Sequence, residues 1–147
     1  MILSAAEFAR RTGLADGAER LVIRPYSSGS QQPASYDLRA ADEISLPLGS
    51  CTLLPTLEWV ELPMDLAGTL RCRSSFGRRG VLLGGGFVDP GFRGQLTLCL
   101  SNLGKEVVVI RKDDRVAQMV LHEVRNPGIL YNGRYQDSLG AVGAKQL

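Results

Sequence analysis

Hydrophobic and polar residues alternate along much of this chain with the period of two that β-strands show. The alternation is clearest over 96–102, where Leu96, Leu98 and Leu100 lie on one face and the residues between them are polar or small. A strand of this kind places one face in a core and the other toward solvent or a ligand. Similar strand-like runs follow one another at short spacing, at 21–23, 52–63, 106–111 and 115–124. Turn residues separate them, so the chain is expected to be all-β, as a sandwich, barrel or jelly roll.

One short helix is expected at the start, over residues 4–12. Ser4 and Glu7 have the spacing of a capping box, Phe8 supplies an apolar anchor, and Gly13 ends the segment. We expect a single domain over 1–147. The stretch from about 132 to 147 has no strong period and is predicted to be a mobile tail.

The composition narrows the possible functions. A net charge of +2 over 147 residues gives no broad basic field, so no nucleic-acid partner is expected. No apolar run reaches the length of a membrane span, so no membrane association is expected. Three scattered cysteines indicate a reduced, cytoplasmic compartment. With His122 as its one histidine and no C-x-x-C, the sequence lacks the ligands of a zinc deaminase.

Arginine and serine gather in the segment 70–80. An arginine fork matches phosphate oxygens, and serine hydroxyls and glycine-freed backbone N–H groups add further donors. The segment is a candidate triphosphate cradle, and the alternative is a solvated turn with surface arginines. Its candidate phosphate ligands are Arg73, Ser74, Ser75 and Arg78.

A glycine-rich segment follows at 84–94. Consecutive glycines allow a backbone to approach a flat ligand closely. Asp89 stands before Pro90 and Gly91, where an aspartate is ordinarily a turn former, but its place after the cradle makes it a candidate catalytic residue.

Two further polar residues interrupt strand-like runs. Gln118 lies in the apolar run at 115–124, where a buried amide needs partners. Asp37 lies within 32–40, which otherwise has the character of a strand. Arg115 and Asp114 have the spacing of a plain surface pair.

Taken in this order, these segments resemble the dCTP deaminase and dUTPase superfamily over essentially the whole chain. MILS, LVIRPY, QPASYDLR and the late segment RYQDSLGAV look like the deaminase branch, and DRVAQM is similar to a dUTPase motif. RSSFGRRG resembles the phosphate-binding motif of the family, and GFVDPGFRG resembles its substrate hairpin. The resemblance implies a distorted jelly roll or β-barrel, a homotrimer with active sites at subunit interfaces, and Mg²⁺ carried by the substrate triphosphate rather than by a protein metal site.

The resemblance also implies roles for individual residues. Asp89 would activate the attacking water, and Gln118 would join the four cradle residues on the phosphates. Base and sugar contacts would come from Gly84, Gly85, Gly86, Phe92, Thr97 and Cys99. Tail contacts to the substrate would come from Tyr131, Arg134 and Tyr135.

One departure from the deaminase pattern decides the predicted activity. Deaminases of this family carry a catalytic glutamate five residues after the glycine that here is Gly94, and that position holds Cys99. A thiol is a poor substitute for a carboxylate that takes a proton from water and returns it. The predicted function is therefore a dUTP pyrophosphatase that forms dUMP and pyrophosphate. The alternatives are a dCTP deaminase, with or without dUTPase activity, and a nucleotide-binding relative without catalysis.

Overall fold

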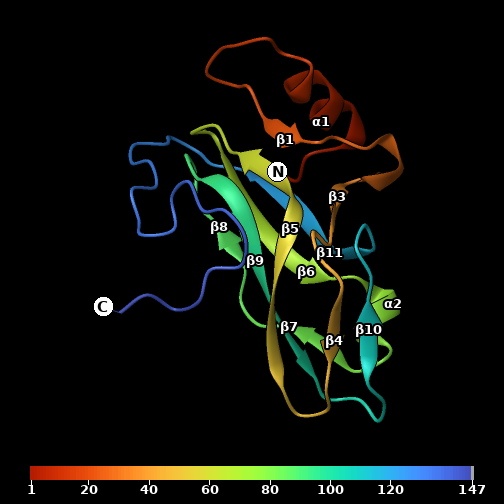
Figure 1. The fold of residues 1–147 in the computed structure, drawn as a ribbon. Coiled ribbons are helices and arrows are strands. Elements are labelled where there is room, and N and C mark those ends of the chain that lie inside the picture. Colours follow the sequence, from red (N-terminus) through yellow and green to blue (C-terminus); the bar gives the residue numbers. More distant parts are fainter. Residues whose placement is uncertain (147) are drawn as a thin grey trace.

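Strands make up most of the ordered structure (Figure 1). The computed structural model describes residues 1–146. Its helical elements are α1 (Ala5–Thr12), the 3-10 turn η1 (Ser28–Ser30) and α2 (Ser74–Gly77). Its strands are β1 (Val22–Arg24), β2 (Gln31–Gln32), β3 (Ser35–Arg39), β4 (Ile44–Leu46), β5 (Cys51–Glu61), β6 (Leu66–Cys72), β7 (Val81–Leu83), β8 (Phe87–Val88), β9 (Arg93–Asn102), β10 (Val108–Ile110) and β11 (Arg115–Glu123). The predicted all-β class with a short N-terminal helix is confirmed.

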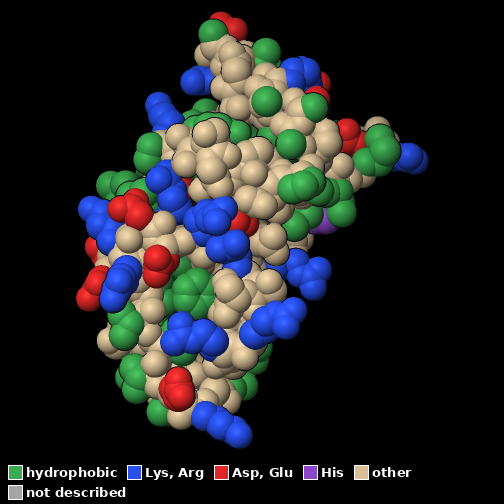
Figure 2. Space-filling model, turned by 90° about the vertical axis from the view of Figure 1, so that its right-hand side faces the viewer, with side chains coloured by type: hydrophobic (Ala, Val, Ile, Leu, Met, Phe, Trp, Pro, Cys, Tyr) green, Lys and Arg blue, Asp and Glu red, His purple; other side chains and the backbone are tan. Residues whose placement is uncertain are grey.

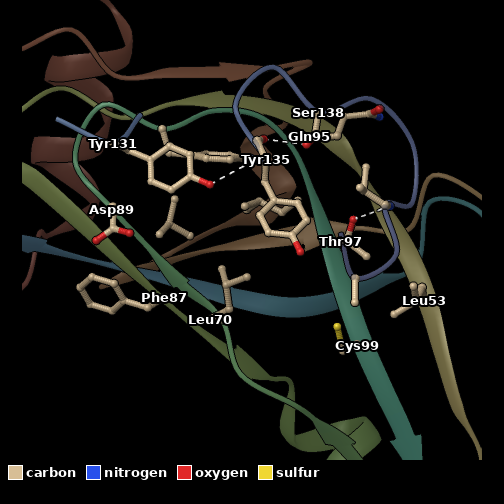
Figure 3. Close-up of a pocket in the computed structure, with 16 residues that line it drawn as sticks. Leu53, Leu70, Phe87, Asp89, Gln95, Thr97, Cys99, Tyr131, Tyr135 and Ser138 are labelled. Carbon is tan, nitrogen blue, oxygen red and sulfur yellow. Dashed lines mark hydrogen bonds between the residues drawn. The ribbon is translucent and has the colours of Figure 1, made fainter. Parts of the chain in front are cut away.

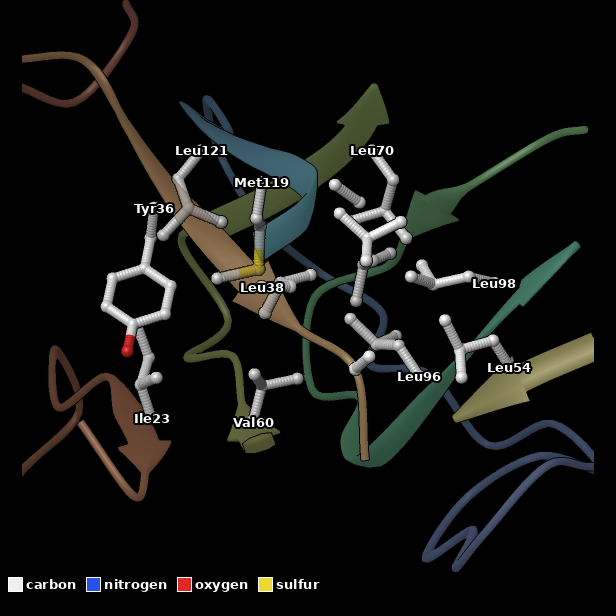
Figure 4. Close-up of a cluster of buried hydrophobic side chains, with 14 of the residues drawn as sticks. Ile23, Tyr36, Leu38, Leu54, Val60, Leu70, Leu96, Leu98, Met119 and Leu121 are labelled. Carbon is white, nitrogen blue, oxygen red and sulfur yellow. The ribbon is translucent and has the colours of Figure 1, made fainter. Parts of the chain in front are cut away.

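Two sheets pack face to face around one core. The first has the strand order β1-β5-β9-β7 and the second has the order β2-β3-β11-β6-β8, with antiparallel pairing throughout both. A separate ribbon pairs β10 with β4. Leucines and other apolar side chains from both sheets meet between them (Figure 4). Tyr36 and Met119 are among the largest side chains with no exposure.

Strand β9 carries the alternation that the sequence predicts. Leu96, Leu98 and Leu100 are buried, and the residues between them are half-buried on the opposite face. The strand pairs with β5, whose register shifts between Pro55 and Trp59. This irregularity places the Thr56 hydroxyl where it accepts the Leu96 N–H at 2.9 Å. The buried Leu96 N–H therefore keeps a partner at the bulge, with a side-chain hydroxyl in place of a backbone carbonyl.

The N-terminal helix begins as predicted. The Ser4 side chain accepts a hydrogen bond from the Glu7 N–H, and Gly13 caps the other end. Arg11 is almost fully buried and forms a two-bond ion pair with Asp65, at 3.0 and 2.8 Å. This pair fixes the helix to the loop that precedes β6 (Figure 1).

Two local features differ from the sequence expectation. The segment RSSFGRRG starts with the short helix α2, because Phe76 turns inward and packs against the core. The run at 106–111 forms only a three-residue strand. Residue 147 of the predicted tail lies outside the described residues, and tail mobility stays a prediction. Within residues 1–146, helix length and hydropathy fall short of what spanning a bilayer requires.

We expect Leu98→Ala to lower the free energy of unfolding by about 2–5 kcal/mol, because it leaves a cavity between the two sheets. Ser101→Ala on the opposite face of β9 is the control, and we expect a loss below about 1 kcal/mol. Urea denaturation followed by circular dichroism measures both. Equal losses in the two variants would contradict the assignment of the core face.

Candidate active site

A pocket of about 410 Å³ lies beside β9 and is closed on one side by the C-terminal segment (Figure 3). Strands β5, β6, β8 and β9 and the turn after β8 supply its other walls. Its lining residues are Leu53, Leu70, Gly86, Phe87, Val88, Asp89, Phe92, Gln95, Leu96, Thr97, Cys99, Tyr131, Tyr135, Ser138, Val142 and Ala144. The walls are mostly apolar with a few polar groups, as small-molecule sites usually are.

The polar face of β9 forms the floor of this pocket. Gln95, Thr97 and Cys99 follow one another at every second position and point to the same side (Figure 3). Their order is a direct result of the strand period, because the leucines between them are held in the core. Burial raises the pKa of the Cys99 thiol, and the nearby Cys51 adds to this effect. Cys99 therefore offers a neutral thiol at neutral pH.

Asp89 is the one carboxylate among the described lining residues. It begins a tight turn in which the Phe92 N–H donates to the Asp89 carbonyl at 3.1 Å. Gly91 has a φ of +82°, which a glycine adopts without strain. The turn leaves the Asp89 side chain exposed at the pocket mouth (Figure 3).

The glycine run before Asp89 has a structural explanation. Gly86 has a φ of +117°, and a Cβ there would lie 2.7 Å from the Cβ of Leu70. Of the three glycines predicted to contact the base, Gly86 alone lines the pocket. Gly84 and Gly85 do not line it, and the Gly84 N–H donates to the Cys99 carbonyl at 2.8 Å.

The C-terminal segment contacts the pocket floor of its own chain. The Gly140 N–H donates to the Gln95 side chain at 2.7 Å, and the Val142 N–H donates to the Thr97 hydroxyl at 3.0 Å. Asp137 forms an ion pair with Arg93 that anchors the segment at its start. Two of the three predicted tail contacts, Tyr131 and Tyr135, therefore lie in the pocket. Arg134 does not, because it donates to the Gln146 carbonyl.

The predicted phosphate ligands lie outside this pocket. Arg73, Ser74, Ser75 and Gln118 are absent from its lining, and Arg78 lines a different hollow together with Lys105. Arg73 and Gln118 lie instead on the outer face of the second sheet. Figure 2 looks onto the side of the molecule that carries α2 and β10 and shows Lys and Arg side chains gathered there. Within one chain the predicted base contacts and the predicted phosphate ligands thus lie in two separate regions, which we call the base pocket and the cradle.

Two residues with no predicted binding role, Asp37 and Arg115, lie beside the predicted phosphate ligand Arg73. Asp37 is fully buried in β3, and one of its oxygens lies 3.1 Å from Arg73 Nε and 3.6 Å from Arg115 Nη1. Burial raises the pKa of Asp37, and the two arginines oppose that rise. The expected surface pair of Arg115 with Asp114 does not form. Asp114 accepts the Arg111 N–H instead.

The residues of the cradle do not fit a protein-bound cation. Over residues 1–146 no group of three or more His, Cys, Asp or Glu side chains is placed to hold a metal. The buried carboxylate at the cradle faces two guanidinium groups, which repel a cation.

Comparison with known proteins agrees with this architecture. Residues 40–124 match the family model described as dCTP deaminase-like. A dCTP deaminase of Thermococcus sibiricus is 35% identical over 136 residues, which cover 82% of this chain and 87% of that protein. A "dCTP deaminase, dUMP-forming" of Halobacterium salinarum is 42% identical over 111 residues, which cover 71% of this chain and 57% of that protein.

Solved structures share the fold. The 2'-deoxycytidine 5'-triphosphate deaminase of Agrobacterium tumefaciens superposes with a TM-score of 0.69 at 19% identity, covering 82% of this chain and 47% of that chain. A native EIAV dUTPase superposes with a TM-score of 0.63 at 20% identity, covering 79% and 98%. One dUTPase neighbour, from phage phi11 of S. aureus, is described with a structural Mg(II) ion.

These relatives contradict the activity predicted from the sequence. The prediction of a dUTP pyrophosphatase is wrong, because the similar proteins carry the name dCTP deaminase and one of them is dUMP-forming. The alternative of a dCTP deaminase, with or without a further step to dUMP, fits these names better. The prediction rested on Cys99 at the position of the family glutamate.

We expect iodoacetamide to alkylate Cys51 faster than Cys99. Cys51 is exposed, whereas Cys99 is half-buried beneath the tail and its pKa is raised by burial. Peptide mass spectrometry at timed intervals measures both rates in one sample. A chain truncated after Tyr131 should label faster at Cys99 and at the same rate at Cys51. Equal rates at the two thiols in the full chain would contradict the covered position of Cys99.

Proposed function

Because the chain belongs to the dCTP deaminase-like family, we propose that it binds dCTP and converts the cytosine ring to uracil by hydrolytic deamination. The observation that carries this proposal is the pocket itself. It combines apolar walls for a pyrimidine and deoxyribose with three polar positions on one strand face and a single carboxylate at its mouth. Deamination of dCTP is also the reaction after which the similar proteins are named.

Base recognition is assigned to the floor of the pocket. The Gln95 side chain and the Thr97 hydroxyl present hydrogen-bonding groups there, and both now bind N–H groups of the tail. A pyrimidine edge offers donors and acceptors of the same kind. The tail must therefore release these two groups when a base binds. Phe92, which packs edge-on against Tyr131 with ring centroids 5.6 Å apart, supplies the apolar surface for the sugar.

The proton transfers are assigned to Asp89. Its carboxylate takes a proton from water, the resulting hydroxide bonds to C4 of the cytosine as the C4=N3 double bond opens, and the carboxyl gives that proton to N3. The carboxylate then takes the proton of the C4 hydroxyl and passes it to the amine, so the C4–N bond breaks, the C4=O bond forms, and ammonia leaves. Asp89 takes this part because the family glutamate is replaced by Cys99, whose raised pKa keeps it protonated. No other described lining residue is a carboxylate.

A second candidate function follows from the presence of Cys99 at the position of the family glutamate. With a thiol at the glutamate position, the chain would bind the nucleotide and leave it unconverted. This reading shares the pocket and the cradle with the first and differs from it only in turnover. A binding measurement and a turnover measurement on the same protein separate the two.

The phosphates are assigned to the cradle of a second copy of the chain. The base pocket and the cradle are separate regions of one chain, and the family resemblance implies a homotrimer with sites at subunit interfaces. Arg73, Ser74, Ser75 and Gln118 would then hold the triphosphate of a nucleotide whose base lies in the neighbouring pocket. We place Mg²⁺ on the phosphate oxygens rather than on protein ligands, and a reduced, cytoplasmic setting suits three free cysteines.

We expect incubation with dCTP and Mg²⁺ to yield a uracil nucleotide and ammonia. Chromatography identifies the base, and a separate assay for pyrophosphate distinguishes dUTP from dUMP as the product. Protection of Cys99 from iodoacetamide by dCTP reports binding independently of turnover. Protection without conversion would select the second candidate function, and the absence of both would exclude dCTP as a ligand.

We expect Asp89→Asn to lower kcat for dCTP by about 10² or more while leaving KM within a few-fold, because the amide keeps the shape and loses the basicity. Asp113→Asn, at an exposed aspartate of the β10–β11 turn, is the control for loss of one negative charge. Full activity in Asp89→Asn would place the base elsewhere.

A further inference from the structure

Asp37 is an unusual residue in this fold because its carboxylate is fully buried on the outer face of a sheet. In β3 it stands opposite Gln118 of β11, and Gln118 in turn stands opposite Arg71 of β6. Paired positions share a face, so this row is the face turned away from the core. Asp37 has no exposure, although its face carries polar residues. The groups that cover it therefore include its two charged neighbours.

Neither oxygen of Asp37 accepts a hydrogen bond from any residue within 1–146. A buried carboxylate ordinarily requires such bonds, since burying an unpaired charge is costly. Its compensation here is the pair of guanidinium groups, both of which approach the same oxygen, Oδ2. The Asp37 carboxylate therefore attracts the two arginine side chains and makes no hydrogen bond with the backbone of the described residues.

The two arginines are also fixed relative to each other. Arg73 Nη1 donates to the carbonyl of Arg115 at 3.3 Å, and Arg115 Nη1 donates to the carbonyl of Gly29 at 2.7 Å. Arg73 uses Nε and Nη1 in its contacts, and Arg115 uses Nη1. The remaining N–H groups of both forks are left for a ligand. Side-chain exposures of 28% and 39% leave both forks partly open to solvent.

We propose that Asp37 is a positioning residue that holds Arg73 and Arg115 as a paired fork for a triphosphate, with Gln118 beside them. The proposal rests on the proposed function, because it takes the cradle to be the phosphate site. It adds Arg115 as a direct phosphate ligand and Asp37 as the group that acts through both arginines. Two preset forks match a chain of phosphate oxygens without the entropy cost of ordering two long side chains on binding.

The sign of one effect separates positioning from simple charge balance. Asp37→Asn removes a negative charge beside a site for anions, and on charge alone this change strengthens phosphate binding. If Asp37 orients the arginines, the same change weakens binding despite the gain in positive potential. A merely structural role lowers stability and leaves the affinity of the folded protein unchanged.

The experiment measures binding of inorganic tripolyphosphate to the full chain by calorimetry at 25 °C. We expect Asp37→Asn to raise Kd by about tenfold or more, which corresponds to the loss of one charge-assisted hydrogen bond. Asp113→Asn is the matched control, because it makes the same change at an exposed aspartate and its positive φ is one that asparagine tolerates. We expect its Kd to stay the same or fall. An unchanged or lower Kd in Asp37→Asn would overturn the proposal.

A second variant keeps the test decisive if Asp37→Asn fails to fold. Arg115→Gln removes a partly exposed fork and is expected to raise Kd by a similar factor, whereas an unchanged Kd would overturn the assignment of Arg115. In the double variant we expect a loss smaller than the sum of the two single losses, because the part of the Asp37 effect that passes through Arg115 is already removed while the part through Arg73 remains. Losses that simply add would contradict the proposal. If wild-type protein binds no tripolyphosphate, the cradle assignment fails, while conversion of dCTP still tests the proposed function separately.

Discussion

The pairing of β9 with β5 is the constraint on which both the core and the site depend. Leucines on one face of β9 close the gap between the two sheets, and the residues between them form the floor of the pocket. A shift of one residue would exchange the two faces and expose the leucines, so packing of the core fixes which side chains face a ligand. The bulge in β5 serves the same arrangement. The Gln95 side chain donates to the Thr56 carbonyl at 2.9 Å, which orients its amide above the floor.

Much of the fold could be predicted from the sequence because local patterns carry it. The period of two over 96–102, the capping serine at Ser4 and the Asp89 turn each depend on a few neighbouring residues, and each is confirmed. The site was harder to predict because it depends on long-range contacts. The sequence marked Asp37 as a polar residue within a strand, but nothing local indicates that it lies against Arg73 and Arg115. Arg78 lines a different hollow from the predicted site because it lies at the end of α2, and this position likewise could not be read from the local sequence.

Cys99 shows how far a single position can guide a functional assignment. Cys99 lies on the polar face of β9, as predicted. Its thiol is part of the floor of the pocket, between Leu70 and Leu53 (Figure 3). The inference from that residue to a different main activity was wrong, because it set one missing carboxylate against the similarity of most of the chain to deaminases. The carboxylate that the structure does place in the pocket is that of Asp89, at the pocket mouth. On the proposed function, the group that moves protons belongs to a turn rather than to the strand.

The central claim is that one catalytic site is built from the base pocket of one copy and the phosphate cradle of another. Co-expression of an Asp89→Asn chain and an Arg73→Ala chain with different tags, followed by purification on both tags, tests it directly. In the mixed assembly some sites pair an intact pocket with an intact cradle, so we predict clear dCTP conversion where each variant alone is nearly inactive. A doubly tagged assembly with no more activity than the two single variants, or a failure to recover any such assembly, would contradict the claim.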